Sequence, residues 1–338
     1  MSTRGASPPS AANPLTAAAA RFRDGLAAVV GASPPGLVLL AVSGGADSMA
    51  MLTLAVAAAL SGGIAVATVD HRLRAAAADE AAMVADHCAR IGIPHATLCP
   101  DAPIAGASVQ AQARTARYAL LADHARAIGA VAIATAHHVD DQAETFLMRA
   151  ARGSGLAGLA GVRERSVIAD AVVVRPLLDW RRAELRAIVR RGDIPFVDDP
   201  SNRDPAHDRT RFRQLLDRNE WLGPAQIARS AAALAEADAD LAAIVDWLWT
   251  TRARSTATGI DLDIADLPRE LCRRLARRAV MTVRDRMGLT DPAFSHATNI
   301  EPLLDALMQR KRASQSGVVV APRASQWRFS PAPPRRGH

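Results

Sequence analysis

Short β-branched runs alternate with longer helix-forming segments from Gly36 to about Gly192, and no other feature limits the possible folds as strongly. Parallel strands need a crossover of a dozen or more residues between them, which a helix supplies. The alternation therefore predicts an α/β fold, a parallel sheet with helices on both faces. The expected strands are Leu37–Val42, Ile64–Val69, His95–Leu98, Val131–Thr135 and Ala171–Val174. The expected helices are Asp47–Leu60, Ala78–Ile91, Ser108–Ile128, Asp140–Ala151 and Arg181–Arg191.

The composition changes after this region. A charged, turn-rich loop at Asp198–Asn202 leads into helical segments, including an alanine-rich amphipathic helix at Pro224–Trp249 and an arginine-bearing helix at Pro268–Met287. We expect a short strand within Thr250–Asp266, and Val318–Pro322 could form another. The C-terminal part of the chain is therefore expected to be mainly helical.

These segments predict a domain organisation. The expected parts are a tail at 1–17, a domain with the parallel sheet at 18–215, a smaller, mainly helical domain at 216–329, and a tail at 330–338. Both tails are rich in proline and small or charged residues, which is typical of disordered termini.

One strand runs directly into a Ser/Gly loop and a helix, with the sequence LLAVSGGADS from Leu39 to Ser48. Glycines let the backbone approach a phosphate, and the N–H groups at a helix N-terminus attract it. Ser43 and Ser48 add hydroxyl donors, whereas Asp47 would repel phosphate unless a cation such as Mg²⁺ lies between them. The loop lacks the spacing and the lysine of a Walker A motif. The alternative is an ordinary turn that caps a helix.

A second cluster, HHVDDQAET, follows the fourth expected strand. The carboxyl ends of parallel strands form the ligand crevice of open α/β sheets. If a helix begins at Asp140, then Asp141 and Glu144 lie on one face, where they can hold Mg²⁺ or an ammonium group. His137 or His138 could contact a phosphate. The alternative is that Asp140 and Asp141 only cap the helix.

Two further motifs are weaker evidence for a binding site. The sequence VDHRLR, Val69–Arg74, ends the second expected strand and would border an adenosine above the sheet. The sequence GSGLAG, Gly153–Gly158, spells a dinucleotide-binding motif but follows a helix and lacks the required acidic residue downstream. We interpret it as a mobile loop at the edge of an active site.

Composition narrows the classes of partner and site. A net charge of +7, from 41 basic and 34 acidic residues, favours a polyanionic partner, although genomic base composition produces the same arginine bias. The three cysteines form no CxxC pair, which disfavours zinc, iron–sulfur and disulfide frameworks and fits a reducing compartment. The longest apolar stretch, Ala50–Val69, is broken by Ser61-Gly62-Gly63, and no signal peptide is recognisable. We therefore expect no membrane association and a cytoplasmic location.

The loop has the form SGGxDS, the pyrophosphate-binding loop of the N-type ATP pyrophosphatases, or PP-loop family. Besides this loop, five motifs occur in one order, and together with it they resemble the tRNA(Ile)-lysidine synthases within that family. The other matching segments are VDHRLR, HHVDDQAET, ARTARY at 113–118, RPLL at 175–178, and DDPSNRD at 198–204 with Arg209–Arg213. The resemblance is close from Leu37 to Arg213 and loose over the remainder.

The resemblance implies an adenine nucleotide α hydrolase-like fold and an ATP-dependent ligase. It makes 18–215 the PP-loop ATP-binding catalytic domain and 216–329 the domain that contacts tRNA. The substrate would be tRNA(Ile) with a CAU anticodon. ATP would adenylate the C2 carbonyl of the wobble cytidine with release of pyrophosphate, and L-lysine would then displace AMP to give lysidine. ATP and Mg²⁺ are the implied cofactors, and a homodimer is among the expected assemblies.

The matched motifs also imply roles for individual residues. Catalytic roles fall to Asp47, Asp141, Glu144 and Arg114. The ATP-binding residues would be Ser43, Gly44, Gly45, Ala46, Asp47, Ser48, His71 and His137, with Mg²⁺ on Asp47. The substrate-binding residues would be Arg117, Asp141, Glu144, Arg209 and Arg213, with the acidic pair associated with lysine.

Contact with tRNA is less clear from the sequence. Arg72 stands where a glycine is common in the family, and Thr210 stands where an asparagine is usual. The helix Glu270–Val280 carries arginines at 273, 274, 277 and 278 on one side, a stripe suited to RNA phosphates, although a solvated face explains it almost as well.

Two other functions stay open at this point. A PP-loop tRNA cytidine sulfur-transferase would use the same ATP chemistry with another nucleophile, and the absence of a CxxC pair disfavours it. A non-catalytic tRNA-binding module would need neither the Ser/Gly loop nor the acidic pair. Consumption of ATP separates this module from both enzymes, and dependence on lysine separates the enzymes from each other.

Overall fold

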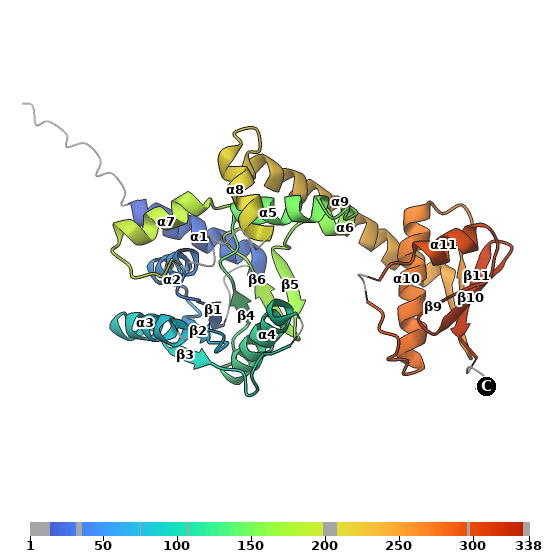
Figure 1. Ribbon diagram of the computed structural model, residues 1–338, viewed down its shortest axis with the longest axis horizontal. Coiled ribbons are helices and arrows are strands. Elements are labelled where there is room, and N and C mark those ends of the chain that lie inside the picture. The colour runs from blue at the N-terminus through green and yellow to red at the C-terminus, as the bar shows by residue number, and fades with distance from the viewer. Residues whose placement is uncertain are drawn as a thin grey trace, which may run out of the picture. The chain divides into compact units, whose positions relative to one another are not determined.

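The computed structural model describes residues 14–31, 36–74, 76–106, 108–198, 208–295 and 298–333 (Figure 1). The chain divides into two compact units, Met1–Ala235 and Glu236–His338. The first unit holds a mostly parallel sheet with helices on both faces, which confirms the predicted α/β class. No helix among the described residues is both long and apolar enough to cross a membrane.

The sheet of the first unit has six strands in the order β3-β2-β1-β4-β6-β5. The strands are β1 (Val38–Ala41), β2 (Ile64–Val69), β3 (His95–Leu98), β4 (Ala132–Ala134), β5 (Arg165–Ile168) and β6 (Ala171–Val174). All neighbours pair in parallel except β5 and β6, which form an antiparallel hairpin. The sequence did not reveal β5 because its four residues are half-buried or exposed and mixed in polarity.

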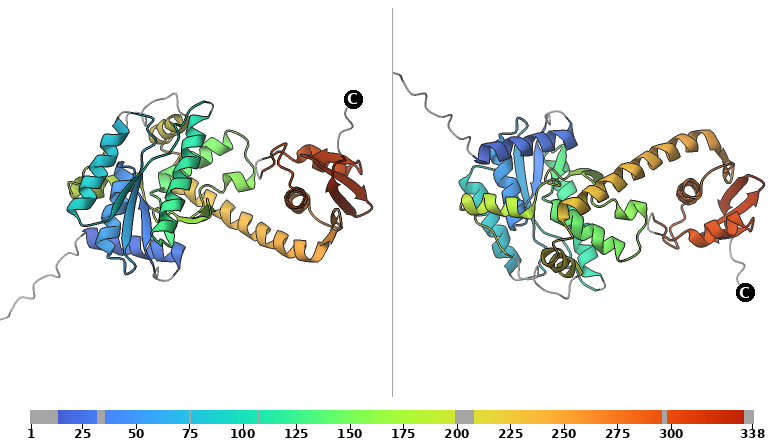
Figure 2. Two further views of the ribbon diagram at one scale, coloured as in Figure 1. Left: turned by 90° about the horizontal axis from the view of Figure 1, so that it is seen from below. Right: turned by 90° about the horizontal axis from the view of Figure 1, so that it is seen from above.

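Alternate side chains of β1 face two separate cores. Val38 and Leu40 pack in the core on the side of α1 (Pro14–Val30), α2 (Ala46–Ala58), α3 (Ala76–Arg90) and α7 (Arg182–Arg191). Leu39 packs instead with Tyr118 and Leu121 of α4 (Val109–Ala127). Burial of strands on both faces explains their continuous apolar sequence. Figure 2 shows α4 separated from α1 and α2 by the sheet.

Helix α1 begins at Pro14, inside the segment 1–17 that the sequence predicted as a tail. Ala19, Phe22 and Leu26 recur at helical spacing and are buried, so the helix belongs to the core. Arg21 fixes its outer side by pairing with Asp179 at 3.1 Å. Residues 1–13 and 334–338 of the predicted tails lie outside the described residues.

The remaining helices of the first unit surround the end of the sheet where the motifs meet. They are α5 (Val139–Ala150), α6 (Leu156–Leu159), α8 (Asp208–Arg218) and the first part of α9 (Pro224–Arg252). The glycine-rich loop predicted to be mobile contains α6. Arg149 of α5 donates hydrogen bonds to the carbonyls of Gly158 (2.7 Å) and Gly161 (3.1 Å), which ties the loop to α5.

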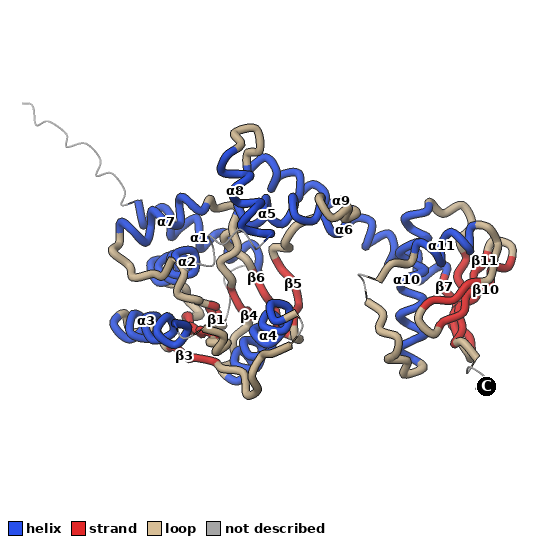
Figure 3. Tube along the Cα trace, viewed as in Figure 1, coloured by secondary structure: helices blue, strands red, loops and turns tan. Residues whose placement is uncertain are grey.

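The second unit combines helices with an antiparallel sheet in the order β7-β8-β11-β10-β9 (Figure 3). Besides the second part of α9, its elements are β7 (Ala253–Thr256), β8 (Gly259–Asp263), α10 (Arg269–Arg286), α11 (Glu301–Met308), β9 (Ala313–Gln315), β10 (Val318–Arg323) and β11 (Gln326–Pro331). The sequence predicts only two short strands here, one within Thr250–Asp266 and one at Val318–Pro322. It missed β11, which reaches into the predicted tail, because polar residues flank the buried Trp327 and Phe329.

Candidate active site

The SGGADS loop joins β1 to α2 and is closed by the side chain of Ser48. The Ser48 hydroxyl oxygen accepts the backbone N–H of Ser43 (3.1 Å) and donates to the carbonyl of Gly45 (2.9 Å). Gly44 has φ +82°, a conformation that side chains rarely adopt. Gly45 is the N-cap of α2, and no side chain among the described residues caps this helix. Its first-turn N–H groups are therefore available to an anion.

Two carboxylates meet at the ring of His138. Asp47, in the first turn of α2, places its Oδ2 atom 3.4 Å from His138 Nε2. Asp141 of α5 places its Oδ2 atom 3.5 Å from the same nitrogen. Asp47 Oδ1 is buried and has no hydrogen-bond partner among the described residues. One imidazole thus links the Ser/Gly loop helix to the acidic motif.

His138 is also the N-cap of α5. Its ring atom Nδ1 accepts a hydrogen bond from the backbone N–H of Asp141 at 3.4 Å. The backbone N–H of His138 in turn donates to Asp141 Oδ2 at 3.2 Å. Asp141 therefore caps the helix and faces Asp47 as well. Asp140 is used differently, because it accepts hydrogen bonds from Arg181 and from the backbone of Arg182 at the start of α7. Asp140 has a structural role here.

The two histidines of the motif differ in charge preference. Burial disfavours the charged form of His138, but the carboxylates of Asp141 and Asp47 outweigh it and raise the pKa. For Asp141, burial favours the neutral acid, but His138, His137 and Arg209 hold the pKa below its usual value. Burial, reinforced by nearby arginines, lowers the pKa of His137 to about 4, so this ring is neutral near pH 7. His137 Nδ1 lies 3.0 Å from the hydroxyl of Thr135.

Glu144 is fully buried and is surrounded by arginines from two other helices. Its Oε1 atom accepts from Arg182 of α7 at 2.5 Å and from Arg213 of α8 at 2.8 Å. Arg209 of α8 lies 3.4 Å from Oε2. Three guanidinium groups leave little negative potential for a substrate ammonium. Of the predicted acidic pair, only Asp141 is without an arginine ion pair among the described residues.

The residues predicted after β2 meet those predicted on α4. Arg117 donates from Nε to His71 Nε2 at 3.3 Å. Arg114 is exposed, with its guanidinium 5.1 Å from the ring centre of Tyr118. Arg114 is also one of the charges that lower the pKa of His137. The structure therefore brings the predicted basic residues of α4 toward the same end of the sheet.

Sequence reasoning missed Arg182 and left His138 as an alternative to His137. The pair Arg181-Arg182 at the start of α7 does indicate buried acidic partners, because cations at a helix N-terminus are unfavourable with the helix dipole unless an anion pairs with them. The partners are Asp140 and Glu144, which no local pattern could identify. Residues 199–204 of the DDPSNRD motif lie outside the described residues, whereas Asp198 accepts from Arg186 at 2.8 Å.

The arginine stripe of α10 is occupied within the second unit. Three of the arginines form ion pairs: Arg273 with Glu270 and Glu301, Arg274 with Asp238 and Glu270, and Arg278 with Asp246. The fourth, Arg277, donates hydrogen bonds to the backbone carbonyls of Ser295 and Thr298. These four side chains hold α10 against its neighbours. They form a structural network, which differs from both a solvated face and a free phosphate-binding stripe.

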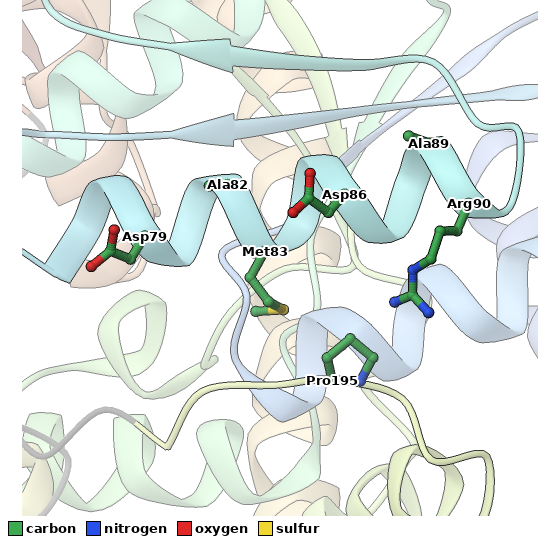
Figure 4. A pocket seen from close by; sticks show the side chains of 7 residues that line it. All are labelled: Asp79, Ala82, Met83, Asp86, Ala89, Arg90 and Pro195. Carbon is green, nitrogen blue, oxygen red and sulfur yellow. The ribbon is translucent and has the colours of Figure 1, made fainter.

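A groove near the loop lies outside this cluster of site residues. Figure 4 shows its lining, which is Asp79, Ala82, Met83, Asp86, Ala89, Arg90 and Pro195. None of these was predicted as a site residue. Within the described ranges, no three His, Cys, Asp or Glu side chains gather into a metal-binding group.

Residues 19–219 match the PP-loop domain family. The chain is 45% identical over 325 residues to the tRNA(Ile)-lysidine synthase of Novosphingobium aromaticivorans, covering 95% of this chain and 96% of that protein. It is 38% identical to the tRNA(Ile)-lysidine synthase of Zymomonas mobilis, covering 93% and 94%. A U34-tRNA thiolase from Methanococcus maripaludis shares the fold, with a TM-score of 0.54 at 16% identity over 66% of this chain and 80% of that one.

Proposed function

The chain belongs to the tRNA(Ile)-lysidine synthases, and on this premise we propose that it converts the wobble cytidine of the CAU anticodon to lysidine at the carboxyl end of its parallel sheet. The enzyme uses ATP and modifies tRNA(Ile). The observation that carries the proposed site is the convergence of Asp47 and Asp141 on His138, beside an uncapped α2 N-terminus.

We assign the ATP phosphates to the loop Ser43–Ser48. The uncapped N-terminus of α2 offers backbone N–H groups and partial positive charge, which suit the β- and γ-phosphates that leave as pyrophosphate. Neutral His137 and exposed Arg114 complete the surroundings of the α-phosphate. Donors preorganised around a developing charge stabilise the transition state without reorganisation.

The residues present fit a magnesium ion, although three protein ligands are not assembled. Mg²⁺ is commonly bound by one or two carboxylates together with substrate phosphates and water. Asp47 supplies one carboxylate, whose buried Oδ1 atom has no partner among the described residues, while Asp141, across the His138 ring, is left for the second substrate. When bound, the ion would neutralise charge on the leaving pyrophosphate. His138 holds both carboxylates in place.

For the second substrate we propose L-lysine, with its ammonium on Asp141 and its carboxylate near Arg209. Asp141 is ionised at neutral pH because its pKa is lowered by His138, His137 and Arg209 against the effect of burial. Arg209 is the most exposed of the three arginines around Glu144 and can reach a second carboxylate. Glu144 acts in this proposal by positioning the arginines.

No observation favours sulfur transfer. Cys88 and Cys272 are buried and Cys99 is half-buried, in separate elements of the fold. The predictions of a homodimer and of a cytoplasmic location stay predictions, and the proposed chemistry depends on neither.

The proposal is tested by mixing the purified protein with Mg²⁺-ATP, labelled L-lysine and unmodified tRNA(Ile) bearing CAU, then following label in RNA and release of AMP. A methionine tRNA with the same anticodon is the control. We expect label in tRNA(Ile) alone, in step with AMP. AMP release without incorporation would show a different nucleophile, and tight tRNA binding without AMP release would contradict catalysis.

A further inference from the structure

We propose that His71 is a hydrogen-bond donor to the adenosine part of ATP and that Arg117 fixes the ring in the tautomer this contact requires. The inference deepens the function proposed above and rests on it. It makes Arg117 a positioning residue, which acts on the nucleotide through His71.

The tautomer follows from the chemistry of the two side chains. A guanidinium group has donors only, so an Arg–His hydrogen bond forces the histidine nitrogen to be the acceptor. Arg117 Nε lies 3.3 Å from His71 Nε2, and Nε2 therefore carries no proton. Burial and the charge of Arg117 both lower the pKa of His71, so the ring is neutral at physiological pH. The single ring proton must then be on Nδ1.

The Nδ1–H group of His71 is a buried donor with no hydrogen-bond partner among the described residues. Leaving a buried donor without a partner is costly, and native structures rarely do so without a reason. The unused donor, held in one orientation by Arg117, is therefore suited to an acceptor on a ligand. Asp70 is occupied by the backbone N–H of Arg72 at 2.8 Å.

His71 lies beside the phosphate-binding loop. Strands β1 and β2 pair in parallel with Leu40 opposite Val66 and Ala41 opposite Ala67, and Val42 donates to the carbonyl of Ala67. Continuing this register beyond the strands brings the segment after Val69 level with the start of the SGGADS loop. A nucleotide whose phosphates are on that loop has its adenosine within reach of the β2 end of the sheet.

The acceptor is expected on the sugar or the base. A neutral N–H group suits an uncharged acceptor, such as a ribose oxygen or a purine ring nitrogen. The phosphates are bound instead by the loop and by the N-terminus of α2. Both classes of acceptor belong to the same adenosine, and nucleotide analogues can separate them.

The tautomer can be measured without any assay of activity. In protein labelled with ¹⁵N-histidine, long-range proton–nitrogen correlation distinguishes the protonated from the unprotonated ring nitrogen, and His71→Asn identifies its signal among nine histidines. We expect His71 to be protonated on Nδ1. His87 is an internal control with the opposite tautomer, because Arg90 donates to its Nδ1 atom at 3.2 Å. A His71 ring protonated on Nε2 would overturn the inference.

Variants then test the contact with ATP. Asparagine places its amide donor near the Nδ1 position, whereas glutamine places it near Nε2. We expect His71→Gln and Arg117→Ala to raise the KM for ATP by roughly two- to tenfold, the effect of one lost uncharged hydrogen bond, with the KM for lysine unchanged. His71→Asn should recover most of the affinity. Arg90→Gln breaks the equivalent pair on α3 and should leave the KM for ATP unchanged.

Nucleotide analogues identify the acceptor. ATP analogues lacking the 2′-hydroxyl, the 3′-hydroxyl, N1, N3 or N7 are compared in wild type and His71→Gln. One analogue is expected to weaken binding to the wild type and not to the variant. Equal losses in both proteins for every analogue would overturn the contact. If wild type forms no lysidine at all, the proposed function fails, whereas normal lysidine formation without this coupling refutes only the inference.

Discussion

Replacing Glu144 by alanine should lower the stability of the first unit markedly, because it leaves three arginines without their common carboxylate. Breaking a buried ion pair costs about 3–5 kcal/mol. The side chains of Arg182, Arg213 and Arg209 are 17%, 22% and 48% exposed, so water recovers part of this loss. We therefore expect a loss of about 2–3 kcal/mol, and at about 2–4 °C per kcal/mol the melting temperature should fall by roughly 5–10 °C.

The assay is thermal unfolding followed by circular dichroism, with lysine-dependent AMP release measured on the same samples. Asp123→Asn is the matched control, because Asp123 and Arg126 form an ion pair at 2.9 Å whose side chains are 72% and 64% exposed. Exposed pairs contribute less than about 1 kcal/mol, so this variant should melt close to the wild type. If Glu144→Ala melts like the control and loses only the lysine-dependent step, Glu144 is a substrate ligand and its role as an anchor is refuted.

Three further predictions follow from the geometry. Gly44→Ala should cost about 1–2 kcal/mol because φ is +82° and should also raise the KM for ATP, whereas Gly92→Ala, with φ +70°, should cost stability alone. Two arginines lower the pKa of Glu301 from 4.5 to about 2, so its stabilisation is complete above pH 4.5 and is lost as pH falls through 2. Glu301→Gln should flatten this part of the pH–stability curve measured by urea unfolding, and an unchanged curve would contradict the assignment. Burial raises the pKa of the Cys88 thiol to about 11, so iodoacetamide at pH 8 should modify half-buried Cys99 before Cys88. Peptide mass spectrometry measures the two rates, and equal rates would disprove this prediction.

The local features of the first unit could be predicted from the sequence. Strands at Ile64–Val69, His95–Leu98 and Ala171–Val174 have the predicted bounds, because each begins directly after a turn residue, and the first and third are short apolar runs. The loop before α2 was predictable for the same reason, since strand, glycines and helix are contiguous in the chain. Local patterns of this kind fix the position of a motif on the sheet.

Contacts between distant segments could not be predicted in this way. Glu144 was expected to bind a substrate ammonium, and only the folded chain shows Arg182 and Arg213 closing on it from two other helices. The arginine stripe of α10 left RNA phosphates and a solvated face both open, and the sequence did not show its acidic partners on other elements. A charge pattern on one helix does not show which charges its neighbours supply. The strands of the second unit were missed because most are short and polar on one face.

The central claim is that this chain adds lysine to the wobble cytidine of tRNA(Ile), and nuclease digestion with mass spectrometry of the anticodon fragment tests it most directly. The tRNA is incubated with protein, Mg²⁺-ATP and L-lysine, and wild type is compared with Asp47→Asn and Asp141→Asn. The account predicts that wild type increases the mass of the CAU fragment by one lysine less one water, at the cytidine, and that both folded variants leave it unchanged. An unmodified fragment with wild type, or full modification by folded Asp141→Asn, would contradict it.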